Sequence, residues 1–278
     1  MCKNKIIIKL IWLLNMKKQD KLTNKFEKVA IKIYNNHNKA IGSYEELKKD
    51  INSKEIVCKL DENNKAAYIK DELVAIIEII NGVYIKYIDN AICDDKDLKK
   101  RKNLQNEYAI KDYPVIALVL ESPHKKEFEL NKIASSFTGK NINKYFLINL
   151  YYFLSFNTFE DCIYNKKNIM IEDGIYKLIL INPIQYQCSL GLKNSIYKND
   201  IFKECWKDKS FKNDFIKRLT KSKPTLIINC CTGQENGNVS GLQKLVQNEI
   251  DKNFKQINRL YGYHPSSKHF VDGFKKCN

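Results

Sequence analysis

Four short and nearly continuous apolar runs dominate the second half of the chain. Longer stretches with helical spacing, including residues 143–156 and 241–254, separate them. The apolar runs are PVIALVLE (114–121), YKLILIN (176–182), PTLIINCC (224–231) and INRLYGY (257–263). Such runs are typical of strands buried on both faces of a sheet. Their alternation with helices predicts an α/β sandwich around a central, mainly parallel sheet of four strands.

The first part of the chain has a different pattern. A capping box in GSYEELKKDI predicts a helix of about ten residues, in which Ser43 is the cap and Glu46 reaches back to the helix start. Two β-rich runs flank Asn81-Gly82, a dipeptide suited to a tight hairpin because both residues tolerate positive φ. These patterns predict a small α+β region.

A highly charged segment follows the predicted hairpin. Residues 94–107, DDKDLKKRKNLQNE, lack an apolar period, which predicts a linker or a solvated helix. We therefore expect two parts, a small α+β region over residues 1–100 and a larger domain over residues 101–278.

Polar residues stand at the ends of the predicted parallel strands. Glu121 follows one apolar run directly, Asn182 ends the next, and YHPSSKHF follows the last. In parallel α/β sheets, ligands bind outside the carboxyl ends of the strands. We expect a functional site where these segments gather.

The balance of charges is strongly basic. The chain has 48 Lys and Arg against 32 Asp and Glu, a net charge of +16 and a pI near 9.3. In a globular protein such an excess predicts a polyanionic partner such as DNA. The competing interpretation is compositional bias, because an AT-rich genome also enriches Lys, Asn and Ile.

Nine cysteines are scattered along the chain without zinc-ligand spacing. Their odd number and irregular spacing predict reduced thiols in an intracellular protein. Lys9 interrupts the apolar opening segment, which lacks a small-residue cleavage site and is too short to span a bilayer. We expect a cytoplasmic protein with an amphipathic first segment, no membrane association and no bound metal.

Five segments at or near the predicted strand ends follow a recognisable order. They are LESPH (120–124), SSFTGKN (135–141), INPIQY (181–186), CCTGQENG (230–237) and YHPSSKHF (263–270). Together they resemble the uracil-DNA glycosylase superfamily, whose first motif ends a strand with an acidic or amide residue near a proline and whose last is His-Pro-Ser. The resemblance covers roughly residues 110–275. It implies a three-layer sandwich and an enzyme that excises bases from DNA; the cysteine spacing of the iron–sulfur relatives is missing, so we expect no cofactor.

Glu121 and His264 are the catalytic residues that the resemblance implies. LESPH resembles the Gly-Glu-Ala-Pro-Gly form of the first motif, with Glu121 at the acid. A carboxylate there can orient a water and favour the oxocarbenium-like state that forms as the base departs. His264 is expected to be neutral and to donate a hydrogen bond to the leaving base. The alternatives are a helix N-cap for Glu121 and a structural role for His264.

Four further residues are expected around the base. Phe137 matches the aromatic residue that stacks on the extruded base, in a segment whose small polar residues favour a loop. Asn182 matches the asparagine that reads the base, although it can pair with uracil or cytosine and its alternative is a simple Asn-Pro turn. Ser122 and His124 are expected to shape the pocket.

The His-Pro-Ser segment is also expected to bind DNA. Ser266 with its backbone amide, Ser267 and Lys268 are candidates for phosphate contacts. Relatives insert a leucine from this loop into the gap left by the flipped base. In this chain Phe270 is the candidate wedge, unless the chain has none.

The substrate implied is a modified pyrimidine, either uracil or a modified cytosine. The bulk of His124 favours uracil, whereas the unusual motifs and the added first region favour a specialised antiviral enzyme that acts on modified bases in phage DNA. A non-catalytic nucleic-acid-binding protein and a metal-dependent nuclease are the alternatives. We expect a monomer with DNA as its partner.

Overall fold

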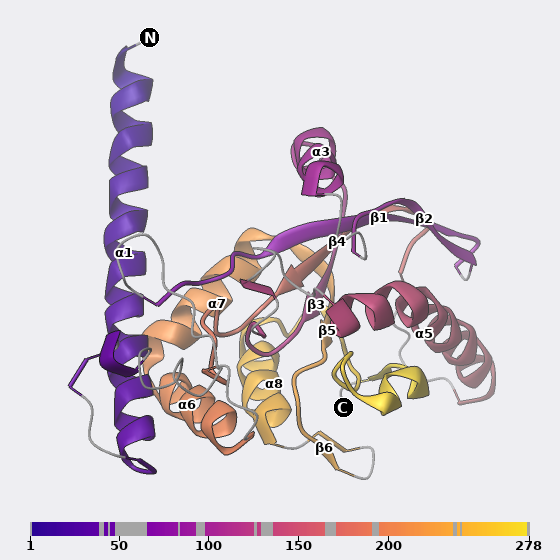
Figure 1. Cartoon of the computed structure of the whole chain (residues 1–278). Coiled ribbons are helices and arrows are strands. Elements are labelled where there is room, and N and C mark those ends of the chain that lie inside the picture. Colours follow the sequence, from indigo (N-terminus) through magenta and orange to yellow (C-terminus); the bar gives the residue numbers. More distant parts are fainter. Residues whose placement is uncertain are drawn as a thin grey trace.

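A computed structural model describes residues 2–38, 42–43, 45–47, 66–82, 84–92, 98–124, 127–128, 136–164, 171–190, 195–235, 238–239 and 241–276. Seven strands form one mixed sheet in the order β2-β1-β4-β3-β5-β8-β9 (Figure 1). These strands are β1 (Glu72–Ile80), β2 (Tyr84–Asn90), β3 (Val115–Val119), β4 (Gly174–Ile181), β5 (Pro224–Asn229), β8 (Asn258–Tyr261) and β9 (Lys275–Lys276). A separate pair consists of β6 (Gln234–Glu235) and β7 (Asn238–Val239).

Helices cover both faces of the sheet and make three layers with it (Figure 1). They are α1 (Cys2–Asn35), α3 (Leu98–Tyr108), α5 (Ser136–Tyr164), α6 (Ser195–Lys207), α7 (Lys209–Lys221), α8 (Gly241–Asn253) and the 3-10 helix η1 (Lys268–Asp272). Alternate residues of β3 enter different cores: Ala117 and Val119 pack with α6, α7 and α8, while Ile116 and Leu118 pack with α5. The period of two in a strand explains how one apolar run supplies both layers.

The four predicted core strands are confirmed, but the expected number of four strands for the sheet is wrong. β4, β3, β5 and β8 are parallel neighbours. β1 and β2 extend one edge and β9 the other, each by antiparallel pairing. β1 is almost wholly buried, and a two-stranded hairpin with β2 could not bury it alone. Its pairing with β4 places its apolar side chains in the sheet. The division into two parts near residue 100 stays a prediction.

Three local predictions in the first part can be compared with the structure. The hairpin is confirmed, with φ of 53° at Asn81 and 70° at Gly82. The Ser43 hydroxyl accepts from the Glu46 backbone N–H at 3.1 Å, while the Glu46 carboxylate accepts from Gly42 N–H at 2.8 Å. The helix is described at residues 45–47, and the rest of its predicted length lies outside the described residues.

The charged segment before β3 forms helix α3 where it is described, and Leu104 of this helix is fully buried against β1 residues. The sequence predicted either a linker or a solvated helix for residues 94–107. The helix is the correct prediction for the described residues of this segment. In the described part of the chain, no helix is both long and apolar enough to cross a membrane.

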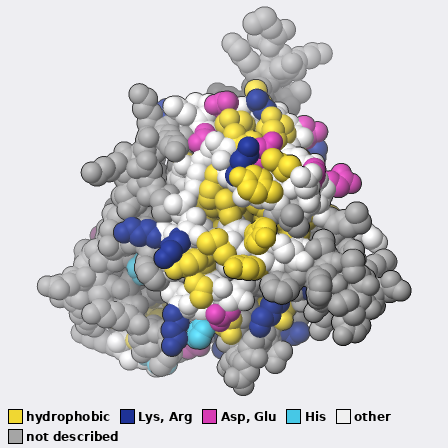
Figure 2. All heavy atoms as spheres, turned by 90° about the vertical axis from the view of Figure 1, so that its right-hand side faces the viewer, with side chains coloured by type: hydrophobic (Ala, Val, Ile, Leu, Met, Phe, Trp, Pro, Cys, Tyr) yellow, Lys and Arg dark blue, Asp and Glu magenta, His cyan; other side chains and the backbone are white. Residues whose placement is uncertain are grey.

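Hydrophobic side chains gather on the face of the molecule that carries β2 and α5 (Figure 2). The large exposed ones on these two elements are Tyr84, Ile88, Ile148, Tyr151 and Tyr152. Lys and Arg side chains lie beside them in the same view.

Gly262 lies at the end of β8, where a side chain would not fit. A Cβ at this position would lie 2.8 Å from Phe274 Cδ1 and 3.4 Å from Cys230 Sγ. Phe274 is 7% exposed and packs against Phe270, so its ring has little room to move.

Gly262→Ala is therefore expected to lower the free energy of unfolding by about 1–3 kcal/mol, the usual cost of overpacking. Urea denaturation measures it. At Gly42 an added Cβ would make only a 3.5 Å contact, so Gly42→Ala is the control and should change stability by less than about 0.5 kcal/mol. Equal effects of the two substitutions would contradict the steric argument.

Candidate functional site

The carboxyl ends of the four parallel strands lie level with one another. Val119 at the end of β3 is in register with both Ile181 of β4 and Asn229 of β5. Asn229 is in turn in register with Tyr261 at the end of β8. The segments that follow these strands therefore leave the sheet at one edge, as the sequence predicted.

Glu121 follows β3 at the point where the strand order reverses. The chain passes from β3 to β4 on one side and later reaches β5 on the other side of β3. α5 lies on one face of the sheet and α6 and α7 on the other, so the connections leave this edge toward opposite faces (Figure 1), which is where ligands bind in open α/β sheets. Glu121 is 2% exposed at this place.

The Glu121 carboxylate has a separate partner for each oxygen. Thr232 N–H donates to Oε2 at 3.2 Å, and Lys198 Nζ lies 3.3 Å from Oε1. A buried carboxylate without partners is strongly unfavourable, and these two contacts stabilise its charged form. The contacts come from α6 and from the loop after β5, so the N-cap alternative does not describe this residue.

His264 is partly buried, and its Nδ1 atom is hydrogen-bonded to Ser266. The backbone N–H of Ser266 donates to Nδ1 at 3.1 Å, and the Ser266 hydroxyl lies 2.7 Å from the same atom. An Nδ1 that accepts from a backbone N–H carries no hydrogen, so the neutral ring has its hydrogen on Nε2. The neutral His264 ring therefore has its donor hydrogen on Nε2, and donation to a leaving base stays a prediction.

Burial lowers the pKa of His264 from 6.5 to about 4; the positive charges of Lys198 and His124 also lower it, while the Glu121 charge raises it. The register of β3, β5 and β8 places the segments that carry Glu121 and His264 at the same edge of the sheet. Glu121 and His264, distant in the sequence, thus converge on one edge of the sheet. Their catalytic roles remain predictions.

Lys198 is the residue of this site that the sequence did not reveal. It lies in the first turn of α6, contacts Glu121 and also lies 3.3 Å from Thr232 Oγ1. Its side chain is 28% exposed, so the ammonium group borders on solvent. Among 48 basic residues, no local pattern distinguishes this lysine; only contact with the buried acid does.

Buried amides hold the strand ends that carry Thr232 and His264. Asn229 Nδ2 donates to the backbone O of Gln243 at 3.1 Å, and Gln243 Nε2 donates to the backbone O of Gly262 at 2.7 Å. The Asn141 amide binds the Pro265 carbonyl from α5. Because α5, α8, β5 and β8 are tied together here, the segment around His264 has a defined path.

Asn182 is 1% exposed directly after β4, and within the described residues its Nδ2 has no hydrogen-bond partner. Gln187, in the same loop, is 3% exposed, and neither of its amide atoms has a partner in that part of the chain. Unpaired buried amide groups are unfavourable by about 1–3 kcal/mol, which makes them rare. Both amides therefore have unused hydrogen-bonding capacity in the loop after β4, whose Ile184 N–H donates to the Glu121 carbonyl.

The other predicted pocket residues are only partly brought together. Burial raises the pKa of the Cys188 thiol, and the Ser122 side chain lowers it. His124 is exposed, and its backbone N–H donates to the Glu127 carboxylate at 2.9 Å. Phe137 lies in the first turn of α5, so the predicted loop is a helix start at this point; its side chain lies outside the described residues.

The DNA-contact predictions for the His-Pro-Ser segment need correction at two residues. Both donors of Ser266 face His264 Nδ1, so they are not presented to a phosphate. Phe270 is 1% exposed, and it packs with Phe274 because its apolar ring completes the core beside α5. It is therefore no surface wedge, whereas the adjacent Val271 is 49% exposed.

Ser267 and Lys268 stay candidates for a DNA contact. Ser267 caps η1 by accepting from His269 N–H at 3.2 Å, and Lys268 is exposed. Cys230 and Cys231 are buried free thiols that pack in the two cores on either side of the sheet. Within the described residues, no group of three or more His, Cys, Asp or Glu side chains has the arrangement of a metal site.

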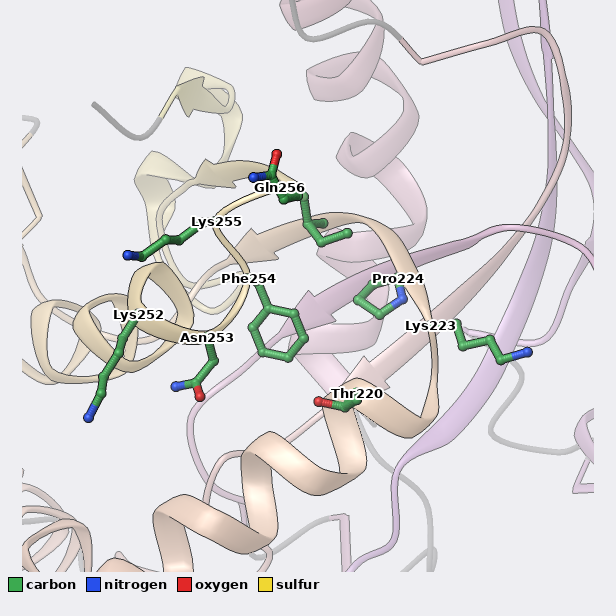
Figure 3. Close-up of a pocket in the computed structure, with 9 residues that line it drawn as sticks. Thr220, Lys223, Pro224, Lys252, Asn253, Phe254, Lys255 and Gln256 are labelled. Atoms are coloured by element: carbon green, nitrogen blue, oxygen red, sulfur yellow. The ribbon is translucent and has the colours of Figure 1, made fainter.

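A hollow of about 650 Å³ lies at the opposite edge of the sheet, beside the amino ends of β5 and β8 (Figure 3). Its lining includes Pro224, Phe254 and three lysines, namely Lys223, Lys252 and Lys255. The lysine side chains point away from one another (Figure 3). Because the hollow is distant from Glu121 and its cations do not converge, it is not the candidate site.

The lowered pKa of His264 predicts a pH-dependent stability. Between pH 6.5 and 4 the unfolded chain binds a proton at this residue and the folded chain does not, so stability falls as the pH falls through this window. Urea midpoints at pH 7 and pH 4.5 should therefore differ more in the wild type than in His264→Gln. An equal difference in both proteins would contradict the lowered pKa.

Comparisons with known proteins complete the description of this site. Neither the known protein families, nor the curated proteins, nor the solved structures contain a match to this chain.

Proposed function

We propose that the protein is a DNA glycosylase, related to the uracil-DNA glycosylase superfamily, that flips out a modified pyrimidine and hydrolyses its N-glycosidic bond. The observation that carries this proposal is the convergence, at the strand-order reversal, of a buried Glu121 carboxylate held by Thr232 and Lys198 with a neutral His264. A net charge of +16 suits a partner with a phosphate backbone.

The chemistry follows from the two groups. Glu121 orients a water toward the anomeric carbon, and its charge stabilises the oxocarbenium-like state as the bond to the base lengthens. His264 Nε2–H donates to the oxygen of the departing base, on which negative charge collects. The products are a free base and an abasic site.

Lys198 and Thr232 act on Glu121 in this proposal. Their contacts hold the carboxylate ionised and oriented without occupying all of its acceptor positions, since each oxygen has two lone pairs. Asn182 supplies an unpaired amide for the base, and Phe137 at the start of α5 stacks on it. Val271 replaces Phe270 as the apolar side chain offered to the gap in the duplex.

The proposal is tested by incubating the protein with duplexes that contain uracil, 5-hydroxymethylcytosine or only unmodified bases. Free base and alkali-labile breaks from a modified duplex, unaffected by EDTA, are the expected result. Strand cleavage that EDTA abolishes would favour a nuclease. Tight, salt-sensitive binding without any abasic product would favour a non-catalytic nucleic-acid-binding protein.

A further inference from the structure

A cluster of charged side chains is buried behind the loop that follows β4. It joins Arg218 of α7, Asp71 before β1, Asp214 of α7 and Lys18 of α1. Arg218 Nη1 donates to both Asp71 oxygens, at 2.5 and 2.6 Å, and Nε donates to Asp214 at 2.7 Å. Arg218 and Asp71 have side chains less than one-fifth exposed, at 18% and 19%.

The cluster holds the backbone that follows Asn182. Arg218 Nη2 donates to the Asn182 carbonyl at 3.0 Å and to the Pro183 carbonyl at 3.3 Å. Both peptide groups after the Asn182 Cα are thus held by the guanidinium that Asp71 pairs with, which restricts the backbone path at Asn182. Pro183 further restricts Asn182 to extended backbone.

The Asn182 side chain is not anchored in the same way. Within the described residues its Nδ2 has no hydrogen-bond partner, although the residue is 1% exposed. The backbone contacts therefore hold the residue, while its donor makes no hydrogen bond to that part of the protein. A residue that recognises a ligand benefits when its backbone is already fixed, because it then loses little conformational freedom on binding.

Residues of the first part of the chain also hold the rest of this loop. Gln19 Nε2 donates to the Tyr186 hydroxyl at 2.8 Å, and the Phe26 ring stacks on Tyr186 with centroids 4.7 Å apart. Ile69 N–H donates to the Gln185 carbonyl at 2.9 Å. The loop is thus packed between the first part of the chain and the sheet.

From these contacts we infer that the Arg218–Asp71 pair is a positioning device for Asn182 and sets which pyrimidine the site accepts. The inference deepens the proposed function and rests on it, because it takes Asn182 as the base-reading residue. It also assigns a role to residues before the predicted boundary near residue 100: they orient a recognition group of the site. A buried ion pair is itself weak support for stability, which leaves specificity as its use.

The test compares Arg218→Lys and Asp71→Asn with the wild type on two duplexes, one with uracil and one with 5-hydroxymethylcytosine. Lysine cannot replace the forked contacts of Arg218, and asparagine lacks the charge of Asp71. We expect the ratio of kcat/KM between the two duplexes to move toward one by about tenfold, the usual size of a lost charge-assisted hydrogen bond. Lys25→Met is the control, because it breaks the 2.6 Å Lys25–Asp208 ion pair of α1 away from Asn182.

A double-mutant cycle separates positioning from general destabilisation. In an Asn182→Ala background, Arg218→Lys should change the ratio no further, because the group that it positions is gone. An unchanged ratio in Arg218→Lys, or an equal change in both backgrounds, would overturn the inference and leave the proposed function intact. A wild type that releases neither base would instead overturn the proposed function, and the inference with it.

Discussion

Glu121→Gln is expected to slow base release by about 10²- to 10⁴-fold, the range for a positioned acid–base group. Glutamine has nearly the same shape and can still accept from Thr232 N–H. It lacks the charge that orients water and stabilises the positive sugar. Single-turnover release of free base from the duplex that the wild type prefers measures this change, and DNA affinity should stay nearly unchanged.

The matched control for this variant is Glu127→Gln. Glu127 is a second buried carboxylate in the same segment, 4% exposed, and it accepts from the His124 backbone N–H. Base release should stay close to that of the wild type. If a folded Glu121→Gln protein released base at the wild-type rate, Glu121 would have no place in the mechanism.

His264→Ala is expected to lower base release by about 10²- to 10³-fold, as the loss of an oxyanion donor usually does. The loss should appear in the rate of the chemical step rather than in DNA affinity, because the donor acts on charge that develops as the base leaves. His264→Gln keeps an N–H donor and should recover part of the rate.

The pH dependence of the rate distinguishes a catalytic role of His264 from a purely structural one. Because burial lowers the pKa of His264 to about 4, the rate should show no titration near 6.5, the ordinary value for histidine. His269 is the control; it is exposed, paired with Asp272 at 3.0 Å, and its replacement by Ala should leave the chemical step unchanged. A rate that His264→Ala does not lower would remove the imidazole from the mechanism.

The contacts of Glu121 also bear on the nuclease alternative. A catalytic divalent metal usually takes several carboxylates, whereas here the acid is paired with Lys198 and a backbone N–H. A lysine ammonium beside the only predicted acid of the site opposes a second cation there. The arrangement therefore supports a carboxylate that acts on water and sugar directly.

Local signals predicted the core strands well, because their apolar runs are short, continuous and bounded by polar residues. Asn81-Gly82 predicted the hairpin for an equally local reason, the positive φ of both residues. Strand β9 and the pairing of β1 with β4 were missed, since neither depends on a pattern within one segment. Phe270 was misjudged because an exposed wedge and a core aromatic residue look alike in a sequence.

The sequence by itself determined the four core strands and the hairpin, and it placed an acid, an amide and a histidine near the ends of three of the core strands. Tertiary structure alone decided that Lys198 meets Glu121, that Ser266 sets the His264 tautomer, and that Arg218 and Asp71 hold Asn182. The physical reason is the distance along the chain over which each effect acts. Strand and turn propensities depend on a few neighbouring residues. Burial, pKa and ion pairing depend on groups that the fold brings together from distant parts of the chain.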